Sequence, residues 1–223
     1  MALDPGTLYV VSTPIGNLED ITIRAISVLR QADIVAAEDT RRTGVLLTAH
    51  GISARMTSFN AHNSRQKVAW IIEEMKGGKT VALVSDSGTP GISDPGGVLV
   101  EECVKAGLGV TAVPGATAVM AALVVSGRPV NKFVFEGFLS NKSARRKKQL
   151  EEFKNETRTV VIYESPHRLV AFLNDVLEVL GDRQISVARE LTKKFEEIKR
   201  GKVSELAEHF SKVRPRGEFT VIL

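Results

Sequence analysis

The sequence predicts a two-domain α/β protein with a mainly parallel sheet in the N-terminal domain and a mixed sheet in the C-terminal domain. Short, apolar, β-rich runs alternate with helical patterns through the first half of the 223 residues. Such alternation is typical of a parallel sheet that helices cover on both faces. The second half also contains strand-like runs, but they lack this regular alternation, so a mixed sheet is expected there.

Four runs in the first half are apolar at nearly every position, which is typical of strands buried on both faces. They cover residues 7–12, 33–38, 80–85 and 109–113. Helices are expected between them. Apolar side chains recur at helical spacing within residues 66–76. Asp94 followed by Pro95 predicts an N-cap and a first-turn proline of a helix that ends near Gly107.

Pro114-Gly115 interrupts the alternation and predicts a domain boundary. We expect an N-terminal domain over residues 1–115 and a C-terminal domain over residues 116–223. The second domain should begin with a helix of small residues and contain a strongly amphipathic helix over residues 169–180. Its expected strands cover residues 133–137, 158–164, 185–190 and 218–223.

The composition is typical of a globular protein with a proper core, with 43% hydrophobic and 25% charged residues. The single cysteine, Cys103, excludes an internal disulfide and fits a reducing compartment. No apolar run approaches the length of a membrane span, so we expect a cytoplasmic protein. The net charge of +4 permits a polyanionic partner without requiring one.

Five loops that follow predicted strands or the boundary are unusually rich in glycine, proline and polar residues. They cover residues 12–17, 38–41, 85–94, 114–117 and 163–168. Ordinary turn chemistry explains any one of them. Ligands, however, bind at the carboxyl ends of strands in open α/β sheets, so the five loops together predict a binding cleft.

Several well-known sites are disfavoured. The chain has no G-x-G-x-x-G after its first strand, no G-x-x-x-x-G-K-[ST] and no G-x-S-x-G. These absences argue against a common dinucleotide fold, a P-loop and an α/β-hydrolase. The four histidines and one cysteine show no metal-ligand spacing, so no metal is expected.

Some polar residues have a structural explanation beside the functional one. Asp86 is explained equally well by ligand recognition and by a hydrogen bond within its own turn. The basic run at residues 145–148 precedes Glu151 and Glu152, and Lys147 and Lys148 lie at i, i+4 spacing from these glutamates. This pattern predicts a solvated helix face rather than a phosphate-binding patch. Ser165-Pro166 is most simply an N-cap and first-turn proline.

Six motifs, in order, resemble the ribosomal RNA small-subunit methyltransferase I family of the tetrapyrrole-methylase superfamily. They are LYVVSTPIGNLEDITIRA, AAEDTRRTG, SDSGTPGISDPG, VPGATA, YESPHR and ARELTK. The resemblance covers nearly the whole chain. It implies a tetrapyrrole-methylase-like fold of two α/β domains, with the cofactor in the cleft between them, and a homodimer.

The same resemblance implies an enzyme that uses S-adenosylmethionine to methylate the ribose 2′-hydroxyl of a cytidine in the decoding centre of 16S ribosomal RNA. The expected partner is the small-subunit ribosomal RNA or the assembled 30S particle. Carried over by motif, the cofactor-binding residues are Pro14, Asp86, Gly88, Thr89, Ala116, Thr117, Tyr163, Ala188 and Gly217. Which carboxylate meets the amino-acid part of the cofactor stays open.

Methyl transfer to a ribose oxygen is an in-line displacement that depends on alignment and is helped by a base. The candidate bases are Glu190, His62 and Glu38, with Asp39 as the alternative beside Glu38. Three cations, Arg41, Arg168 and Lys193, are candidates for binding substrate phosphates, although structural ion pairing explains them equally well.

Two other functions remain open at this point. One is methylation of a tetrapyrrole such as a corrin precursor, which needs a large apolar site rather than one lined by Arg and Lys. The other is a ribosome-assembly factor that binds RNA without catalysis. Family sequences continue past Leu223 into a further small helical region. Cofactor binding is therefore expected to survive here, while recognition of the ribosomal substrate weakens.

Overall fold

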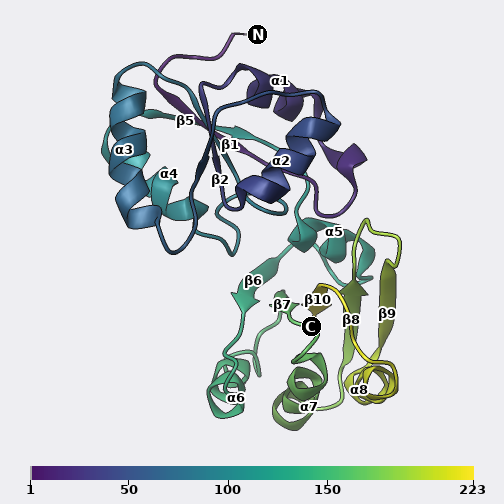
Figure 1. The fold of residues 1–223 in the computed structure, drawn as a ribbon. Helices are drawn as coiled ribbons and strands as arrows, with labels where there is room; N and C mark the ends of the chain where they lie inside the picture. Colours follow the sequence, from purple (N-terminus) through teal and green to yellow (C-terminus); the bar gives the residue numbers. More distant parts are fainter. Residues whose placement is uncertain (1) are drawn as a thin grey trace. The chain divides into compact units, whose positions relative to one another are not determined.

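The computed structural model describes residues 2–223, which divide into two compact units (Figure 1). The first unit ends at Thr117, and the second runs from Ala118 to Leu223. Among the described residues, each unit contains its own five-stranded sheet. The first sheet is parallel and the second is mixed, which confirms the predicted fold class.

Sheet A, in the first unit, has the strand order β3-β2-β4-β1-β5, and all its neighbouring strands pair in parallel. The strands are β1 (Thr7–Val11), β2 (Ile34–Ala37), β3 (Met56–Ser58), β4 (Val81–Val84) and β5 (Gly109–Val113). The residues of β2 and β4 are buried throughout, as the continuous apolar runs predict.

Helices cover both faces of sheet A (Figure 1). Helices α1 (Ile23–Gln31) and α2 (Thr40–Ala49) pack on one face through Val28, Leu29 and Leu47. Helices α3 (Ser64–Lys76) and α4 (Gly96–Lys105) pack on the other face through a second cluster that includes Ile71, Met75 and Leu99. A short 3-10 helix, η1 (Leu18–Asp20), precedes α1.

Sheet B, in the second unit, has the strand order β6-β7-β10-β8-β9. Only β6 and β7 pair in parallel among its described strands, and the other pairs are antiparallel. The strands are β6 (Phe133–Phe138), β7 (Thr159–Glu164), β8 (Gln184–Arg189), β9 (Glu197–Lys202) and β10 (Phe219–Ile222).

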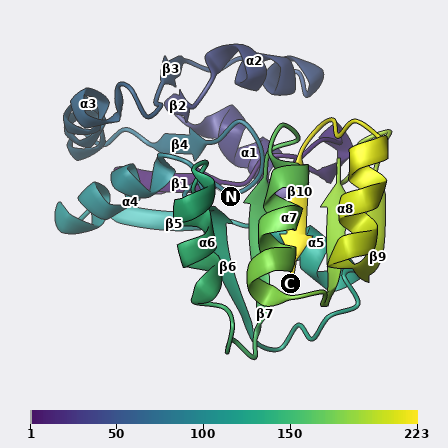
Figure 2. The same ribbon diagram turned by 90° about the horizontal axis from the view of Figure 1, so that it is seen from below.

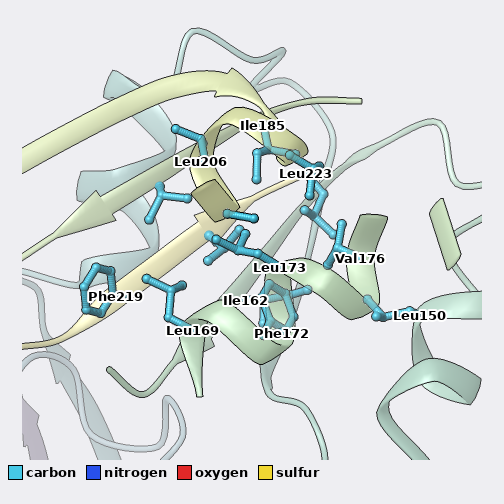
Figure 3. Close-up of a cluster of buried hydrophobic side chains, with 14 of the residues drawn as sticks. Leu150, Ile162, Leu169, Phe172, Leu173, Val176, Ile185, Leu206, Phe219 and Leu223 are labelled. Carbon is cyan, nitrogen blue, oxygen red and sulfur yellow. The ribbon is translucent and has the colours of Figure 1, made fainter. Parts of the chain in front are cut away.

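The two faces of sheet B are covered unequally (Figure 2). Helix α5 (Ala118–Val125) packs on one face. Helices α6 (Ser143–Glu151), α7 (Leu169–Leu180) and α8 (Val203–Lys212) pack on the other. Leu150, Phe172 and Leu206 bring these three helices into one core, which also contains Ile162 of β7 (Figure 3). This core holds the second unit together.

The predicted strands are all present, but β3 and β9 have no counterpart among them. β3 has three residues, and β9 has the sequence EIKRGK, which shows no apolar run. β9 lies at an edge of its sheet, where charged residues are common because they discourage further pairing.

The predicted start of the helix after β4 is wrong by one residue. Helix α4 begins at Gly96, and Pro95 occupies the N-cap position. Asp94 still caps the turn, since its Oδ1 accepts hydrogen bonds from Gly96 N at 2.7 Å and Gly91 N at 2.8 Å. One carboxylate thus organises both the loop and the helix start.

The expectation of a solvated basic face on α6 holds for Arg145 and Lys148, which are exposed, but is wrong for Arg146. Arg146 is 2% exposed, and its Nη2 lies 2.5 Å from Oδ2 of Asp175 on α7. Lys147 pairs with Glu178 of α7 at 2.6 Å rather than with a glutamate of its own helix. The reason is that α6 packs against α7, which presents carboxylates to the basic run.

Three further properties concern the described residues. Within residues 2–223 no helix is both long and apolar enough to cross a bilayer. The same residues contain no group of three His, Cys, Asp or Glu side chains arranged to hold a metal ion. Cys103 is a buried free thiol whose pKa is raised to about 11 by burial, so it stays protonated and unreactive at neutral pH.

Candidate functional site

Sheet A has a topological switch point between the neighbouring strands β1 and β4. The helix that follows β1 packs on one face of the sheet, and the helix that follows β4 packs on the other. Ligands of open α/β sheets bind at the carboxyl ends of such a strand pair. The loops after β1 and β4 are therefore the first place to look for a site.

Hydrogen bonds join the loops that follow β1, β4 and β5. The backbone N–H of Thr13 donates to the carbonyl of Gly88 at 2.9 Å. Thr89 Oγ1 lies 2.9 Å from Ser12 Oγ and donates to the carbonyl of Ala116 at 3.2 Å. The structure thus brings together Gly88, Thr89 and Ala116, three of the residues predicted to bind the cofactor.

Glycine is required at two positions of this joined loop cluster. Gly88 has φ +86°, and a Cβ there would lie 3.3 Å from Cγ2 of Ile15. A Cβ on Gly115 would lie 2.8 Å from Cβ of Ser12. Side chains are excluded at both places, so the loops approach each other through their backbones. Pro14 is buried directly after Thr13, and Thr117 directly follows Ala116.

Two side-chain carboxylates accept backbone hydrogen bonds between the loops after β2 and β4. The N–H of Asp86 donates to Oε2 of Glu38 at 3.0 Å, and the N–H of Asp39 donates to Oδ1 of Asp86 at 2.9 Å. Asp86 therefore bonds a neighbouring loop rather than its own turn. Its second oxygen lies 3.6 Å from Nε of Arg42.

The environment of Glu38 favours its protonated form. Burial raises the pKa of this carboxyl most strongly, and the negative charges of Asp86 and Asp94 raise it further against the hydrogen bond from Asp86 N. Glu38 is half-buried, and its carboxyl has a raised pKa. This is expected of a general base, which must both accept and release a proton.

The other polar candidates of the first unit have local partners or stand apart. Asp39 caps α2, and hydrogen bonds from Arg41 hold the pKa of its carboxyl well below the ordinary value. Arg41 is exposed and lies 2.6 Å from Asp39. His62 lies in the exposed turn after β3, where its backbone N–H donates to Asn60 Oδ1 at 3.1 Å.

In the second unit, Tyr163 and Ala188 lie in register on the face of sheet B that α5 covers. Both are paired with Thr220 of the intervening strand β10. The ring of Tyr163 contacts Phe135 and Phe138, with centroid distances of 4.9 and 5.6 Å. The two residues predicted to bind the cofactor thus lie on one face of sheet B, with two phenylalanine rings packed against Tyr163.

Glu190 lies just past β8 in a compact network with Gly217. Its backbone has φ +49°, and its Oε1 accepts hydrogen bonds from Lys193 Nζ at 2.9 Å and from Glu218 N at 3.0 Å. Burial opposes the charge of Glu190, but these hydrogen bonds outweigh it and lower the pKa. Glu190 is consequently a well-positioned anion and a weak base.

Replacing Gly217 by alanine is expected to disturb this network. Gly217 has φ +87°, and a Cβ there would lie 2.3 Å from the Glu190 carboxyl carbon. The left-handed backbone alone costs alanine about 1–2 kcal/mol. Thermal unfolding should show a larger loss for G217A than for the control G107A. Gly107 has φ +70° with no atom within 4 Å of an added Cβ. Equal losses would show that Glu190 moves away freely.

Arg168 and Lys193, predicted to bind phosphates, already have carboxylate partners. Arg168 pairs at 2.6 Å with Glu164, whose side chain is fully buried. Lys193 bridges Glu190 and Glu218, and these hydrogen bonds raise the pKa of its amine even though burial lowers it. The i,i+4 spacing of Glu164 and Arg168 was the sequence signal for this pair. Glu218 and Arg42 had no such signal, because their partners are distant in sequence.

Comparison with known proteins adds the family context. Residues 7–207 match the family described as tetrapyrrole (corrin/porphyrin) methylases. The chain is 52% identical to ribosomal RNA small subunit methyltransferase I of Thermotoga maritima over 218 residues, which is 98% of both chains. It is 46% identical to the protein of the same name from Halalkalibacterium halodurans, covering 99% of this chain and 76% of that one.

Solved structures with the same fold are more distant in sequence. A cobalt precorrin-4 methyltransferase has a TM-score of 0.71 at 18% identity, covering 97% of this chain and 94% of that one. Uroporphyrin-III C-methyltransferase from Thermus thermophilus, complexed with S-adenosyl homocysteine, has a TM-score of 0.67 at 20% identity, covering 97% and 96%. At these identities the likeness establishes the fold alone.

Proposed function

The chain belongs to the ribosomal RNA small subunit methyltransferase I family of the tetrapyrrole (corrin/porphyrin) methylases, and from this premise we propose that it methylates small-subunit ribosomal RNA. The methyl donor is S-adenosylmethionine. The acceptor is the 2′-hydroxyl of a cytidine ribose in the decoding centre of 16S ribosomal RNA, methylated in the cytoplasm. The observation that carries the proposal is the 52% identity across 98% of the Thermotoga maritima relative.

The polar groups of the joined loops fit this cofactor. S-adenosylmethionine supplies a methyl group on a positively charged sulfonium and carries an ammonium group as well. Asp86 offers a carboxylate to a cation, and the side-chain-free position at Gly88 lets backbone groups approach a ligand closely. In the second unit, Tyr163, Ala188 and Gly217 are proposed to contact the cofactor too, and each set of residues is testable by itself.

Proton removal from the ribose hydroxyl is assigned to Glu38. Its raised pKa lets the carboxylate accept a proton more readily than an ordinary surface carboxylate does. Glu190, held as an anion by Lys193 and the N–H of Glu218, is assigned to positioning rather than to proton transfer. Alignment of the two reactants supplies the remaining acceleration.

The substrate class is tested by methyl transfer from labelled S-adenosylmethionine to three acceptors in parallel: assembled 30S particles, naked 16S RNA and a corrin precursor. We expect label in the RNA of one or both ribosomal acceptors and none in the tetrapyrrole. Label in the corrin precursor alone would overturn the substrate while retaining the cofactor. Cofactor binding without transfer to any acceptor would instead favour a non-catalytic RNA-binding role.

Replacing Asp86 by asparagine tests the cofactor assignment. The variant keeps an oxygen for the N–H of Asp39 but removes the negative charge, and hydrogen bonds to charged groups contribute about 1.5–3 kcal/mol. The dissociation constant for S-adenosylhomocysteine, measured by calorimetry, should therefore rise about 10-fold or more. The matched control is E101Q, at an exposed carboxylate of α4, which should leave the affinity unchanged. Equal affinities in D86N and wild type would remove Asp86 from the site.

A further inference from the structure

A cavity of about 90 Å³ lies in the second unit, at the edge of sheet B where the parallel strands β6 and β7 begin. Glu164 lies at the other end of β7, five residues from Thr159, and Tyr163 directly precedes it. At about 3.3 Å per residue, the cavity is about 17 Å along the strand from Glu164. Its lining includes Arg128, Pro129, Glu156, Arg158, Thr159 and Arg183.

The lining combines three arginines with one glutamate, so positive charge is in excess. Arg158 is neutralised by Glu156, since its Nη2 lies 2.6 Å from the carboxylate. Arg183 uses its Nε to donate to the carbonyl of Leu180 at 3.3 Å. The guanidinium charges of Arg128 and Arg183 have no carboxylate partner among the described residues.

Arg128 carries the observation that points to a ligand. Its Nε is buried and has no hydrogen-bond partner within the described part of the chain. Buried polar groups are nearly always paired, and a charged donor without an acceptor is especially unfavourable. An acceptor from outside the chain would satisfy this group.

The loops that form the cavity are fixed in place. Thr159 Oγ1 donates to the carbonyl of Pro129 at 2.7 Å, and Thr159 N donates to the carbonyl of Lys132 at 3.3 Å. These bonds tie the connection between α5 and β6 to the start of β7. This connection and the one between α6 and β7 run along the same end of sheet B (Figure 2). The part of the cavity wall that carries Arg128 and Arg158 is thus preformed.

We propose that this cavity binds a phosphate group. A guanidinium presents its N–H donors in a planar fork that matches phosphate oxygens. One water needs about 10–15 Å³ on the same measure, so the cavity has room for a compact tetrahedral anion. The proposal concerns a site separate from methyl transfer and does not depend on it.

Calorimetric titration of the full chain with inorganic phosphate tests the site. We expect saturable binding of one phosphate per chain, weakened at least tenfold in R128Q and in R183Q and unchanged in R145Q. Arg145 is an exposed arginine of α6 outside the cavity. Phosphate should also raise the unfolding temperature of the wild type and not of R128Q, because a ligand stabilises only the state that binds it. Absent or unsaturable binding, or equal binding by wild type and both pocket variants, would overturn the proposal and leave a water-filled cavity.

The source of the phosphate group is distinguished by a second titration, with a short RNA oligonucleotide carrying a 5′-phosphate and the same RNA with a 5′-hydroxyl. If RNA supplies the group, inorganic phosphate should compete with the phosphorylated oligonucleotide, and R128Q should bind it more weakly. If free phosphate is the ligand, R128Q and wild type should bind both oligonucleotides equally. Either result is compatible with the site, whereas failure of the first titration leaves methyl-transfer activity untouched and refutes the pocket alone.

Discussion

Replacing Glu38 by glutamine is expected to lower kcat for methyl transfer by about 10²–10⁴-fold, the usual contribution of a positioned general base. Glutamine preserves the oxygen that accepts the N–H of Asp86 but cannot take up a proton. The affinity for S-adenosylhomocysteine should stay within about twofold of wild type, because the hydrogen-bonded loops are retained. The measurement is single-turnover transfer with saturating cofactor. A loss of cofactor affinity with unchanged kcat would assign Glu38 to binding instead.

The pH dependence of the same variant supplies an independent check. The wild-type methyl-transfer rate should rise with pH through a pKa above the ordinary carboxyl value of about 4.3. This rise of the rate with pH should be absent in E38Q. A raised folded-state pKa means that Glu38 stabilises the fold only while protonated. That contribution is lost as pH rises through the folded-state pKa, so E38Q should unfold at a higher temperature than wild type at pH 7. Glu190→Gln is the control. It should keep the rise of the rate with pH, and it should not unfold at a higher temperature than wild type at pH 7.

Replacing Arg146 by alanine is expected to destabilise the protein by about 3–5 kcal/mol, the usual cost of breaking a buried ion pair from one side. Nε and Nη2 of Arg146 lie 2.7 and 2.5 Å from Oδ2 of Asp175. Ser143 Oγ also donates to this carboxylate, so the variant leaves a buried anion with only part of its partners. Urea-induced unfolding measures the loss.

The neighbouring Arg145 provides the matched control on the same helix. It is exposed and has no ion pair among the described residues, so R145A should change stability by less than about 0.5 kcal/mol. The double variant R146M/D175L should recover much of the loss, because well-packed apolar replacements of buried pairs are often tolerated. A cost below about 1 kcal/mol for R146A would contradict a structural role for this pair.

Much of the fold follows from local sequence patterns. The apolar runs predict β1, β2, β4 and β5 to within one residue at each end, because these strands are buried on both faces of sheet A. The stripe from Leu169 to Leu180 coincides with α7 for the same kind of reason, since its apolar side faces one continuous core. Burial of a regular helix or strand imposes a periodic pattern of apolar residues, and this pattern is visible in the sequence.

What the sequence does not reveal depends on contacts between distant segments. Asp175 meets Arg146 across 29 positions, and Asp86 meets Glu38 across 48. The sequence predicts a solvated surface for Arg146 and Lys147, because only intrahelical partners are visible in a sequence. The raised pKa of Glu38 has the same origin, since it depends on burial and on two carboxylates from another loop. Positions such as Gly217 show a constraint only once Glu190 is placed beside them.

The measurement that tests the central claim most directly is the identity of the methylated nucleoside. Small-subunit RNA from particles incubated with the protein and labelled S-adenosylmethionine is digested to nucleosides and resolved by mass spectrometry. The account predicts label in 2′-O-methylcytidine from a single decoding-centre position, absent when E38Q replaces the wild type. Label on a base, on another nucleotide, or undiminished in E38Q would contradict it.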